Sequence, residues 1–477
     1  MAQTTIAQPQ DFTPAYNPVR YLIDSTNKNL TGFKYIFDVY DGATRIGRFK
    51  VLPRITDGYG ENDFSRFLNS YLGWDFEPTI TTDYEATNCL FGYEVKVGEE
   101  YLAEFTYTSS LTASGTIVRV NVTNTFAIGD QINIAQVDGG AANPLVEGLH
   151  SVINASATWF EINVPWSSVT NATIDGVVTY ADNRKIVTYD ITNFSKEVFN
   201  GVFTWPEFPS YDYTNYTLTA NTKLWLTNQP RTNFYATLGQ DIWLNAKPKV
   251  GKRIIFENNS GEQFYKSVVS SSGIVGIAVG PNNHGTLTPI GGAVLPLIKD
   301  DTTSYNVYYD DSGQKSVKYR IDIDRRPSIE EVDLVFLDRM GSMSSFAFQL
   351  KNYERGEVTR EELNQDVPGY VSAGQWTYDT KEFGYRTINL NLVKSLELNT
   401  NWQTQEMATY FEELVTSPQC FIKYVTYNCD DGIVVTSTEY VPVIVTTNSF
   451  EVYKQRNKNL IKQSIVVKLA NNNAING

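Results

Sequence analysis

The chain has 477 residues, of which 42% are hydrophobic and 19% are charged, and its net charge is −14. This composition is that of a folded protein, and the length predicts about two to four domains. The acidic balance argues against nucleic acid as a partner. Membrane insertion is not expected either, because no apolar run approaches the roughly 18 residues that a spanning helix needs.

The chain is rich in aromatic residues and poor in histidine, with 30 Tyr, 25 Phe, 8 Trp and 2 His. Among many Thr and Asn, this balance is typical of proteins exposed outside the cell. The first residues, MAQTTIAQPQDF, nevertheless lack the basic and apolar regions of a secretory signal. A protein made in the host cytoplasm without a signal peptide, and released by lysis as part of a particle, satisfies both observations. The expected localisation is therefore the virion.

Residues 1–300 are expected to form an N-terminal β domain that an insertion interrupts. Large apolar side chains alternate with other residues over 33–39, which is the period of a strand with one buried face. Asp41-Gly42 favours a tight turn, and 48–52 can return as the partner strand. A short helix is predicted at 63–72, with an aspartate at its N-cap.

Residues 109–183 are predicted to be the insertion, a small β module. Its short strands are expected at 117–120, 131–134, 159–164 and 176–180, after a run at 109–115 that reads as a linker. The flanking segments, 100–108 and 185–192, both alternate as strands. The module is therefore predicted to be inserted between two strands of one sheet of the N-terminal domain, at a loop.

Residues 301–477 are predicted to form a C-terminal β-sandwich. The segment 354–370 is charged and polar and is expected to be an excursion from it. In contrast, Ile388, Leu390 and Leu392 alternate with two asparagines, a pattern that predicts a half-buried strand.

One α-helix is predicted in this sandwich, at about 404–416. Thr400 and Gln403 have the spacing of a capping box, and Pro418 is expected to end the helix. The apolar stripe follows the helical period and consists of Met407, Tyr410, Phe411 and Leu414. The fold class is therefore mainly β, with several sandwich or barrel modules and one helix on the C-terminal sandwich.

No catalytic motif stands out, and a non-enzymatic protein is the leading interpretation. The two histidines are not adjacent to a plausible nucleophile, and no GxSxG, HExxH or phosphate-binding loop is present. A glycosidase would need two carboxylates, and Asp322 with Asp324 is one candidate pair. However, their alternation with isoleucines is explained by a solvated strand face. No cofactor and no metal site are expected, since the oxygen-rich segment 57–63 lacks the twelfth-position carboxylate of a calcium loop.

An aromatic segment with two prolines is the candidate site for contact with a partner. Its members are Trp205, Phe208, Tyr211, Tyr213 and Tyr216. Aromatic faces stack on sugar rings, so a host-surface glycan is one possible ligand. Packing in the core or against a neighbouring subunit is the preferred alternative, because Tyr and Trp are favoured there too.

Several stretches resemble structural proteins of tailed bacteriophages that infect Bacteroidetes hosts. In the N-terminal half they are PAYNPVRYLIDSTN, FKYIFDVYDG and FLNSYLGWDF. In the C-terminal half they are LVFLDRMGSMSSFAF, INLNLV, SPQCFIKY and VPVIVTTNSFEVYKQRNKNLIKQSIVVKLA, which are similar to tail or baseplate proteins. The resemblance implies a β-rich virion component repeated around the tail axis, with no catalytic residue.

The leading hypothesis is a structural protein of a phage tail or baseplate, which assembles with itself and with other virion proteins. The alternative is a carbohydrate-binding adhesin or fibre that contacts the host surface. A glycan hydrolase is the third hypothesis. Self-assembly, glycan binding by the isolated chain, and loss of activity on replacing one carboxylate would distinguish them.

Overall fold

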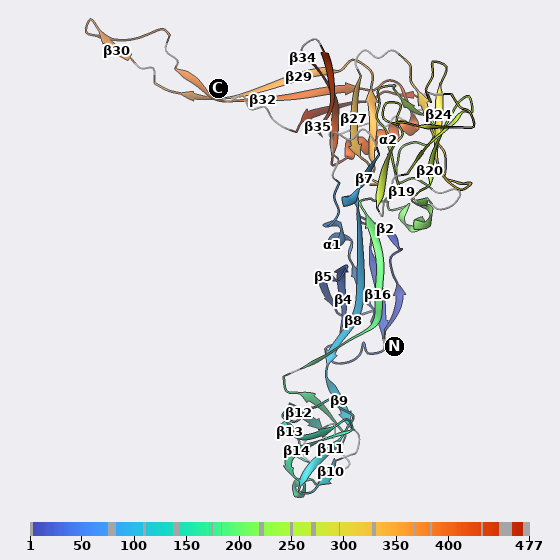
Figure 1. Ribbon diagram of the computed structural model, residues 1–477. Helices are drawn as coiled ribbons and strands as arrows, with labels where there is room; N and C mark the ends of the chain where they lie inside the picture. Colours follow the sequence, from blue (N-terminus) through green and yellow to red (C-terminus); the bar gives the residue numbers. More distant parts are fainter. Residues whose placement is uncertain are drawn as a thin grey trace. The chain divides into compact units, whose positions relative to one another are not determined.

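The computed structural model describes residues 3–74, 83–107, 111–136, 143–170, 172, 175–182, 184–218, 224–248, 251–268, 273–294, 296–326, 331–366, 369–381, 384–430, 433–447 and 460–470. The protein is mainly β, with several sheets and a helix of 12 residues in the C-terminal part, which confirms the predicted fold class (Figure 1). It divides into two compact units. Unit 1 comprises Met1–Thr13, Pro18–Arg66 and Gly92–Glu197, and unit 2 comprises Pro14–Asn17, Phe67–Phe91 and Val198–Gly477.

Two of the sheets in unit 1 enclose an aromatic core. One has the strand order β1-β3-β6, and the other has the order β2-β16-β8-β4-β5. The strands are β1 (Gln3–Ala7), β2 (Phe12–Pro14), β3 (Arg20–Ser25), β4 (Lys34–Asp41), β5 (Thr44–Val51), β6 (Gly60–Asp63), β8 (Leu90–Leu102) and β16 (Lys185–Phe199). The ring of Phe64 lies 5.6 Å from that of Tyr21 on β3 and 5.9 Å from that of Phe37 on β4, so it joins the two sheets.

The first elements largely follow the sequence. The strand predicted at 33–39 is confirmed as β4, and β5 is its antiparallel partner across the turn. The predicted helix is shorter than expected, because α1 spans only Ser65–Asn69. Oδ1 of Asp63 accepts a hydrogen bond from the Ser65 amide at 2.9 Å, in the manner of a cap.

The residues between β8 and β16 form a separate seven-stranded sheet with the order β10-β11-β14-β13-β12-β15-β9. Its strands are β9 (Glu104–Tyr107), β10 (Leu111–Ser114), β11 (Ile117–Asn121), β12 (Gln131–Gln136), β13 (Gly148–Ser156), β14 (Trp159–Pro165) and β15 (Gly176–Tyr180). The four strands predicted here are confirmed as β11, β12, β14 and β15. Two were missed: β10 lies in the run read as a linker, and β13 buries few of its side chains. β8 and β16, which flank this sheet in the chain, are neighbours in the five-stranded sheet.

Unit 2 contains two further sheets in its first half. The four-stranded one has the order β17-β19-β22-β7, and the larger one has the order β18-β26-β24-β20-β21-β23, with β25 paired to β24. The strands are β7 (Tyr84–Ala86), β17 (Thr217–Leu218), β18 (Phe234–Ala236), β19 (Trp243–Pro248), β20 (Arg253–Asn258), β21 (Gln263–Ser267), β22 (Ile274–Ala278), β23 (Thr288–Ile290), β24 (Ser304–Asp311), β25 (Gln314–Lys315) and β26 (Tyr319–Ile323). Because β24 pairs with β20, the larger sheet continues across the domain boundary expected at residue 300.

The second half of unit 2 is a seven-stranded sheet with the order β28-β27-β34-β35-β37-β32-β29. Its strands are β27 (Val332–Leu337), β28 (Met343–Phe348), β29 (Tyr353–Asn364), β32 (Tyr385–Asn399), β34 (Cys420–Asp430), β35 (Ile433–Val445) and β37 (Ser464–Leu469). Two short pairs accompany it, β30 (Gly369–Ser372) with β31 (Gln375–Tyr378) and β33 (Gln403–Thr404) with β36 (Leu460–Ile461). The segment 354–370, expected to be a polar excursion, contains the strand β29, whose residues are all exposed.

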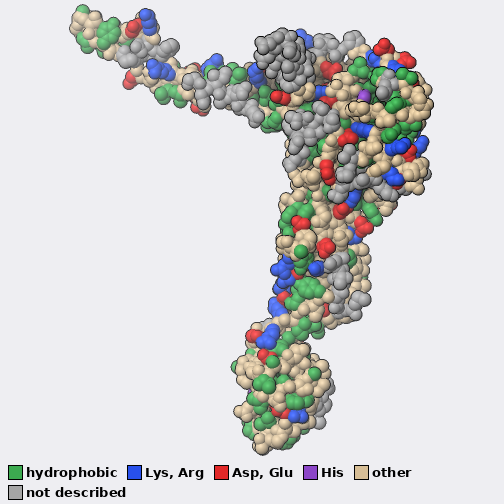
Figure 2. Space-filling view, in the orientation of Figure 1, with side chains coloured by type: hydrophobic (Ala, Val, Ile, Leu, Met, Phe, Trp, Pro, Cys, Tyr) green, Lys and Arg blue, Asp and Glu red, His purple; other side chains and the backbone are tan. Residues whose placement is uncertain are grey.

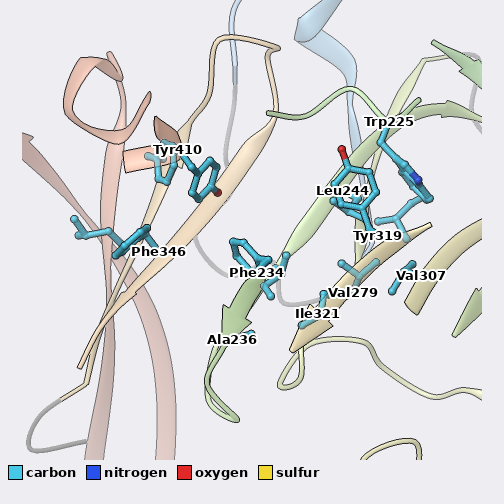
Figure 3. Close-up of a cluster of buried hydrophobic side chains, with 14 of the residues drawn as sticks. Trp225, Phe234, Ala236, Leu244, Val279, Val307, Tyr319, Ile321, Phe346 and Tyr410 are labelled. Carbon is cyan, nitrogen blue, oxygen red and sulfur yellow. The ribbon is translucent and has the colours of Figure 1, made fainter. Parts of the chain in front are cut away.

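The predicted helix is confirmed as α2 (Gln405–Thr416). Its cap differs from the prediction: the side chain of Thr404, not of Thr400, accepts a hydrogen bond from the Met407 amide. The predicted stripe is buried, and Phe411 lies 5.6 Å from Phe346 of β28 between ring centroids. Figure 3 shows Tyr410 and Phe346 on one side of Phe234, with Trp225 and Tyr319 on the other, inside one continuous core.

In unit 1, the buried carboxylate of Asp38 depends on an arginine. Nε and Nη2 of Arg48 donate to its two oxygens, each at 2.7 Å, and the Tyr189 hydroxyl donates at 2.8 Å. Burial raises the pKa of Asp38, but these hydrogen bonds outweigh it and the net pKa is lowered. A carboxylate with a lowered pKa contributes stability at neutral pH, and this contribution is lost as the pH falls from about 4 through the folded-state value.

The variant Arg48→Met is therefore expected to lose about 2 kcal/mol of unfolding free energy at pH 7, because it leaves a buried carboxylate without its main partner. The deficit should shrink at pH 3, where the carboxyl group is neutral in the variant. Urea unfolding at the two pH values measures both quantities. Arg45, whose guanidinium lies 3.8 Å from Asp38, is the control, and Arg45→Met should lose less than about 0.5 kcal/mol. An equal deficit for Arg48→Met at pH 3 and pH 7 would contradict this assignment.

Candidate functional site

The predicted aromatic segment follows β16 and folds back through two single-turn helices, η3 (Phe208–Ser210) and η4 (Tyr213–Asn215). Pro209 lies in the first turn of η3, where its missing amide proton costs nothing. The Asp212 side chain accepts a hydrogen bond from the Thr214 amide at 2.9 Å and so caps η4. These two turns bring together rings that are close in sequence.

Three of the five predicted site residues pack together, around a fourth ring that the prediction did not include. The ring of Tyr211 lies 4.8 Å from that of Phe203 and stacks on that of Tyr216 at 5.6 Å. Phe208 stacks on the other side of Tyr211 at 6.3 Å. The short spacing of these residues in the sequence therefore does predict a real cluster.

The other two predicted residues are Trp205 and Tyr213. Trp205 is 83% exposed, and Tyr213 is half-buried on η4. Neither contributes to the wall of the cavity described next. The grouping of all five as one contact surface is therefore only partly reproduced in the structure.

Tyr211 and Tyr216 form part of the wall of a cavity of about 500 Å³ within unit 2, here called the aromatic cavity. The segment Leu224–Arg231 supplies a second wall, and Tyr319 of β26 a third. The loop between β27 and β28 closes it with Arg339 and Met340. No local sequence signal marks these contributions, because four separate segments supply them.

Charged side chains surround the aromatic cavity. Arg339 donates to Glu207 at 2.6 Å and also forms an ion pair with Glu413 at 2.7 Å. The hydrogen bond from Arg339 lowers the pKa of Glu207 to about 2, so this carboxylate stays ionised at physiological pH. Of the lining residues, Glu207 and Asp212 are acidic, and Arg231 and Arg339 are basic. Glu413, the second partner of Arg339, adds one further negative charge.

A buried amide without a protein partner lies next to this cavity. Gln229 lines the cavity and is 2% exposed, and neither its Nε2 nor its Oε1 is hydrogen-bonded to any described residue. Nδ2 of Asn228 likewise lacks a partner within the described part of the chain. These amide atoms are buried, and each one without a hydrogen bond costs about 1–3 kcal/mol of stability.

The carboxylate of Asp338 is hydrogen-bonded to the two residues that precede Gln229. Its Oδ2 accepts hydrogen bonds from the Asn228 amide and from the hydroxyl of Thr227, both at 3.3 Å. The loop that carries Asp338 requires glycine at its turn, since Gly341 has φ +71° and a Cβ there would lie 1.9 Å from the carbonyl oxygen of Asn200. The hydrogen bonds to Asp338 and the turn at Gly341 thus fix the positions of Thr227 and Asn228 in the folded chain.

The second candidate feature is a long hairpin, here called the arm, formed by β29 and β32. The two strands pair from Tyr353–Glu397 to Asn364–Tyr385, whereas β37 pairs with β32 only over Ser395–Asn399. The hairpin therefore runs past the end of β37 as a two-stranded ribbon (Figure 1). All 12 residues of β29 are exposed.

One face of the arm carries apolar side chains together with charged ones such as Arg360 and Lys394. Val358 lies opposite Leu392, and the next pair on the same face is Arg360 with Leu390. Val358, Leu390 and Leu392 form what we call the apolar stripe. The other face carries polar pairs such as Thr359 with Asn391. The alternation that predicted a half-buried strand is thus present, but Val358 is 40% and the neighbouring Ile388 63% exposed.

The end of the arm carries a second, smaller hairpin, β30 with β31, here called the tip. Val371 pairs with Trp376 on one face, and the Trp376 ring lies 5.7 Å from that of Tyr378. These three side chains are 71%, 62% and 53% exposed, respectively. Figure 2 shows hydrophobic surface at this end of the arm. Exposed Trp and Tyr side chains are typical of interaction sites.

The candidate catalytic carboxylates are each bound to an arginine. Asp322 accepts from Arg320 at 2.9 Å, and Asp324 forms an ion pair with Arg326 at 2.6 Å. Within the described residues, no group of three or more His, Cys, Asp or Glu is placed to bind a metal ion. Across the same residues, no helix has both the length and the hydropathy required to traverse a bilayer.

No protein-family model matches the sequence, and no curated protein matches it. Among solved structures, the chain is similar to a protein from Corynebacterium diphtheriae named as membrane anchored. The two share 9% identity with a TM-score of 0.15, over 95% of this chain and 88% of that one. A TM-score this low carries no argument, so function has to be inferred from the aromatic cavity and the arm.

Proposed function

We propose that this chain is a structural protein of a phage tail or baseplate, and that it assembles with further copies of itself through the arm. The apolar stripe carries this proposal. On β32 its sequence has the alternation of a strand with one buried face, yet Val358, which lies opposite Leu392 on β29, is 40% exposed. A partner that covers the apolar stripe would explain why an alternating apolar sequence is found on a strand that its own chain leaves partly exposed.

Three physical arguments support this role for the arm. A two-stranded hairpin is at best marginally stable in water, so a long one implies a supporting surface. β29 is the last strand of its sheet, and an edge strand offers unpaired backbone groups to another chain. The tip adds Trp376 and Tyr378, residues of the kind that dominate binding energy at interfaces.

A second copy is the partner proposed, because most assemblies of soluble proteins are symmetric and built from one chain. Repetition around a tail axis, as the resemblance to phage tail proteins implies, would place one arm at every subunit contact. The neighbouring virion proteins would then bind to surfaces other than the arm.

The direct test shortens the arm. Gly356 and Lys394 lie opposite each other, so an Asn-Gly turn can join them and replace residues 357–393, which include the whole apolar stripe and the tip. The complete chain is expected to form a defined oligomer at micromolar concentration by light scattering, and the shortened chain is expected to be monomeric with an unchanged melting temperature. A complete chain that stays monomeric, or a shortened chain with the same oligomeric state, would contradict the proposal.

Antibody labelling of particles released from the producing host tests the location separately. Labelling of the tail or baseplate in several copies is the expected result. Self-association of the purified chain without any labelling of particles would retain the assembly role and reject the virion.

A further inference from the structure

We propose that the free edge of β29 pairs with the same edge of a second copy, antiparallel and with Val358 of both copies at a two-fold axis. The inference rests on the proposed assembly through the arm and names the contact that the arm makes. It stands on three features of β29: an edge that no described strand occupies, apolar side chains placed symmetrically about Val358, and charges of opposite sign placed symmetrically about it too.

The edge of β29 offers its backbone to another strand. Among the described strands β29 pairs with β32, and it is the last strand of its sheet. The irregularity in this pairing leaves Ile388 of β32 without an opposite residue, so β29 itself runs without interruption. Two paired arms would form a four-stranded sheet, which is stable where a single hairpin is only marginal. Because a two-fold contact joins copies in pairs, a ring around a tail axis would consist of such pairs.

The apolar side chains of β29 select the register. Tyr353 and Leu363 are 48% and 49% exposed, and they lie at equal distances along the strand on either side of Val358. Residues that face each other across an antiparallel pair point to the same side of the sheet and interact. With Val358 at the axis, Tyr353 of each copy would therefore lie opposite Leu363 of the other. The two Val358 side chains would meet, and Leu392, opposite Val358 in each arm, would extend the row across both apolar stripes.

The charges of β29 complement one another in the same register. Arg355 and Glu361 also lie at equal distances from Val358, so the arginine of each copy would face the glutamate of the other. Arg355 contacts Glu397 of its own β32, but its side chain is 68% exposed and has further N–H donors for a second carboxylate. Opposite charges that face each other across a strand pair stabilise it, so this pattern favours a second copy as the partner.

One pair of like charges remains in this register, and its effect is reduced. Glu354 would face Glu362 of the second copy, but Lys394 forms an ion pair with Glu354 at 2.8 Å within its own arm. Moving the axis by one residue in either direction is less favourable, because Glu357 would then face itself or Glu361.

The test exchanges the two charges in the complete chain and measures self-association by sedimentation equilibrium. Arg355→Glu and Glu361→Arg each set like charges opposite each other at two places in the contact, so each should weaken association at least about tenfold. The double variant restores both pairs with reversed polarity and should associate within about threefold of the unmodified chain. Loss of the contact with Glu397 affects Arg355→Glu and the double variant equally, so recovery in the double variant isolates the contact between copies.

A second double variant, Arg355→Glu with Glu357→Arg, is the matched control. It has the same net charge and changes the same exposed face of β29, but it leaves like charges opposite each other at positions 355 and 361, so association should stay weak. Single variants that associate like the unmodified chain, or equal recovery in both double variants, would overturn this pairing. If the shortened chain is then still monomeric, assembly through the arm stands and only the pairing is wrong. A complete chain that is monomeric would overturn both.

Discussion

Replacement of Asp338 by alanine is expected to lower the free energy of unfolding by at least about 3 kcal/mol, because one buried carboxylate accepts five hydrogen bonds. The side chain is 3% exposed. Its donors are the amides of Asn228, Met340 and Ser342 and the hydroxyls of Thr227 and Ser344, at 2.9–3.3 Å. Alanine would leave these donors buried without an acceptor, and each such loss is expensive in a site that water does not reach.

Urea unfolding is measured at pH 8, where the group is ionised, because burial raises the pKa of Asp338 to about 7. Since this folded-state pKa lies above the unfolded value, the stability of the unmodified chain falls as the pH rises toward 7, and the loss measured at pH 8 is therefore the smallest one expected. Asp322→Ala is the control. That carboxylate is bonded to Arg320, whose side chain is 53% exposed, so the loss should stay below about 1 kcal/mol. A loss for Asp338→Ala as small as that of the control would show that the loop does not depend on this carboxylate.

The sequence predicts those parts of the fold whose patterns are local. The strand β4 and the helix α2 both place their large side chains at the period of one buried face, and both are found where expected. The cap of α2 was misassigned to Thr400. Thr404 is held instead by the pairing of β33 with β36, a contact over more than fifty residues that no local pattern reveals.

β29 shows why other parts could not be predicted. Its residues include Glu354, Arg355, Glu357 and Arg360, and all of them are exposed. A strand that buries neither face within its own chain has no hydrophobic alternation to recognise. Its pairing partner, β32, does have the alternation, and there Leu390 and Leu392 are half-buried whereas Ile388 is 63% exposed. Under the proposed assembly, a second copy would cover the apolar side chains that remain exposed.

The aromatic cavity was found from the sequence only in part, for a related reason. Tyr211 and Tyr216 are close in sequence and could be grouped as aromatic residues near prolines. Gln229, Tyr319 and Arg339 come from other segments, and nothing in their immediate neighbours distinguishes them. That the amide of Gln229 has no hydrogen-bond partner among the described residues can be seen only in the folded structure.

The variant Val358→Lys is expected to weaken self-association at least about 100-fold, equivalent to roughly 2.8 kcal/mol. If the apolar stripe is covered by a second copy, a lysine at its centre would have to lose its hydration opposite Leu392 and beside Leu390. The stability of the isolated chain should not change, because Val358 is already 40% exposed there.

Thr359→Lys provides a stringent control for this prediction. The two residues are adjacent on β29, both are β-branched and exposed, and both substitutions add one positive charge to the same strand. Their side chains lie on opposite faces of the arm, since Thr359 pairs with Asn391 on the polar face. Sedimentation equilibrium of both variants separates the two possible causes. A large loss for Val358→Lys alone places the interface on the apolar stripe, an equal loss in both variants would indicate general charge repulsion, and association unchanged in both would exclude this stripe as the contact between copies.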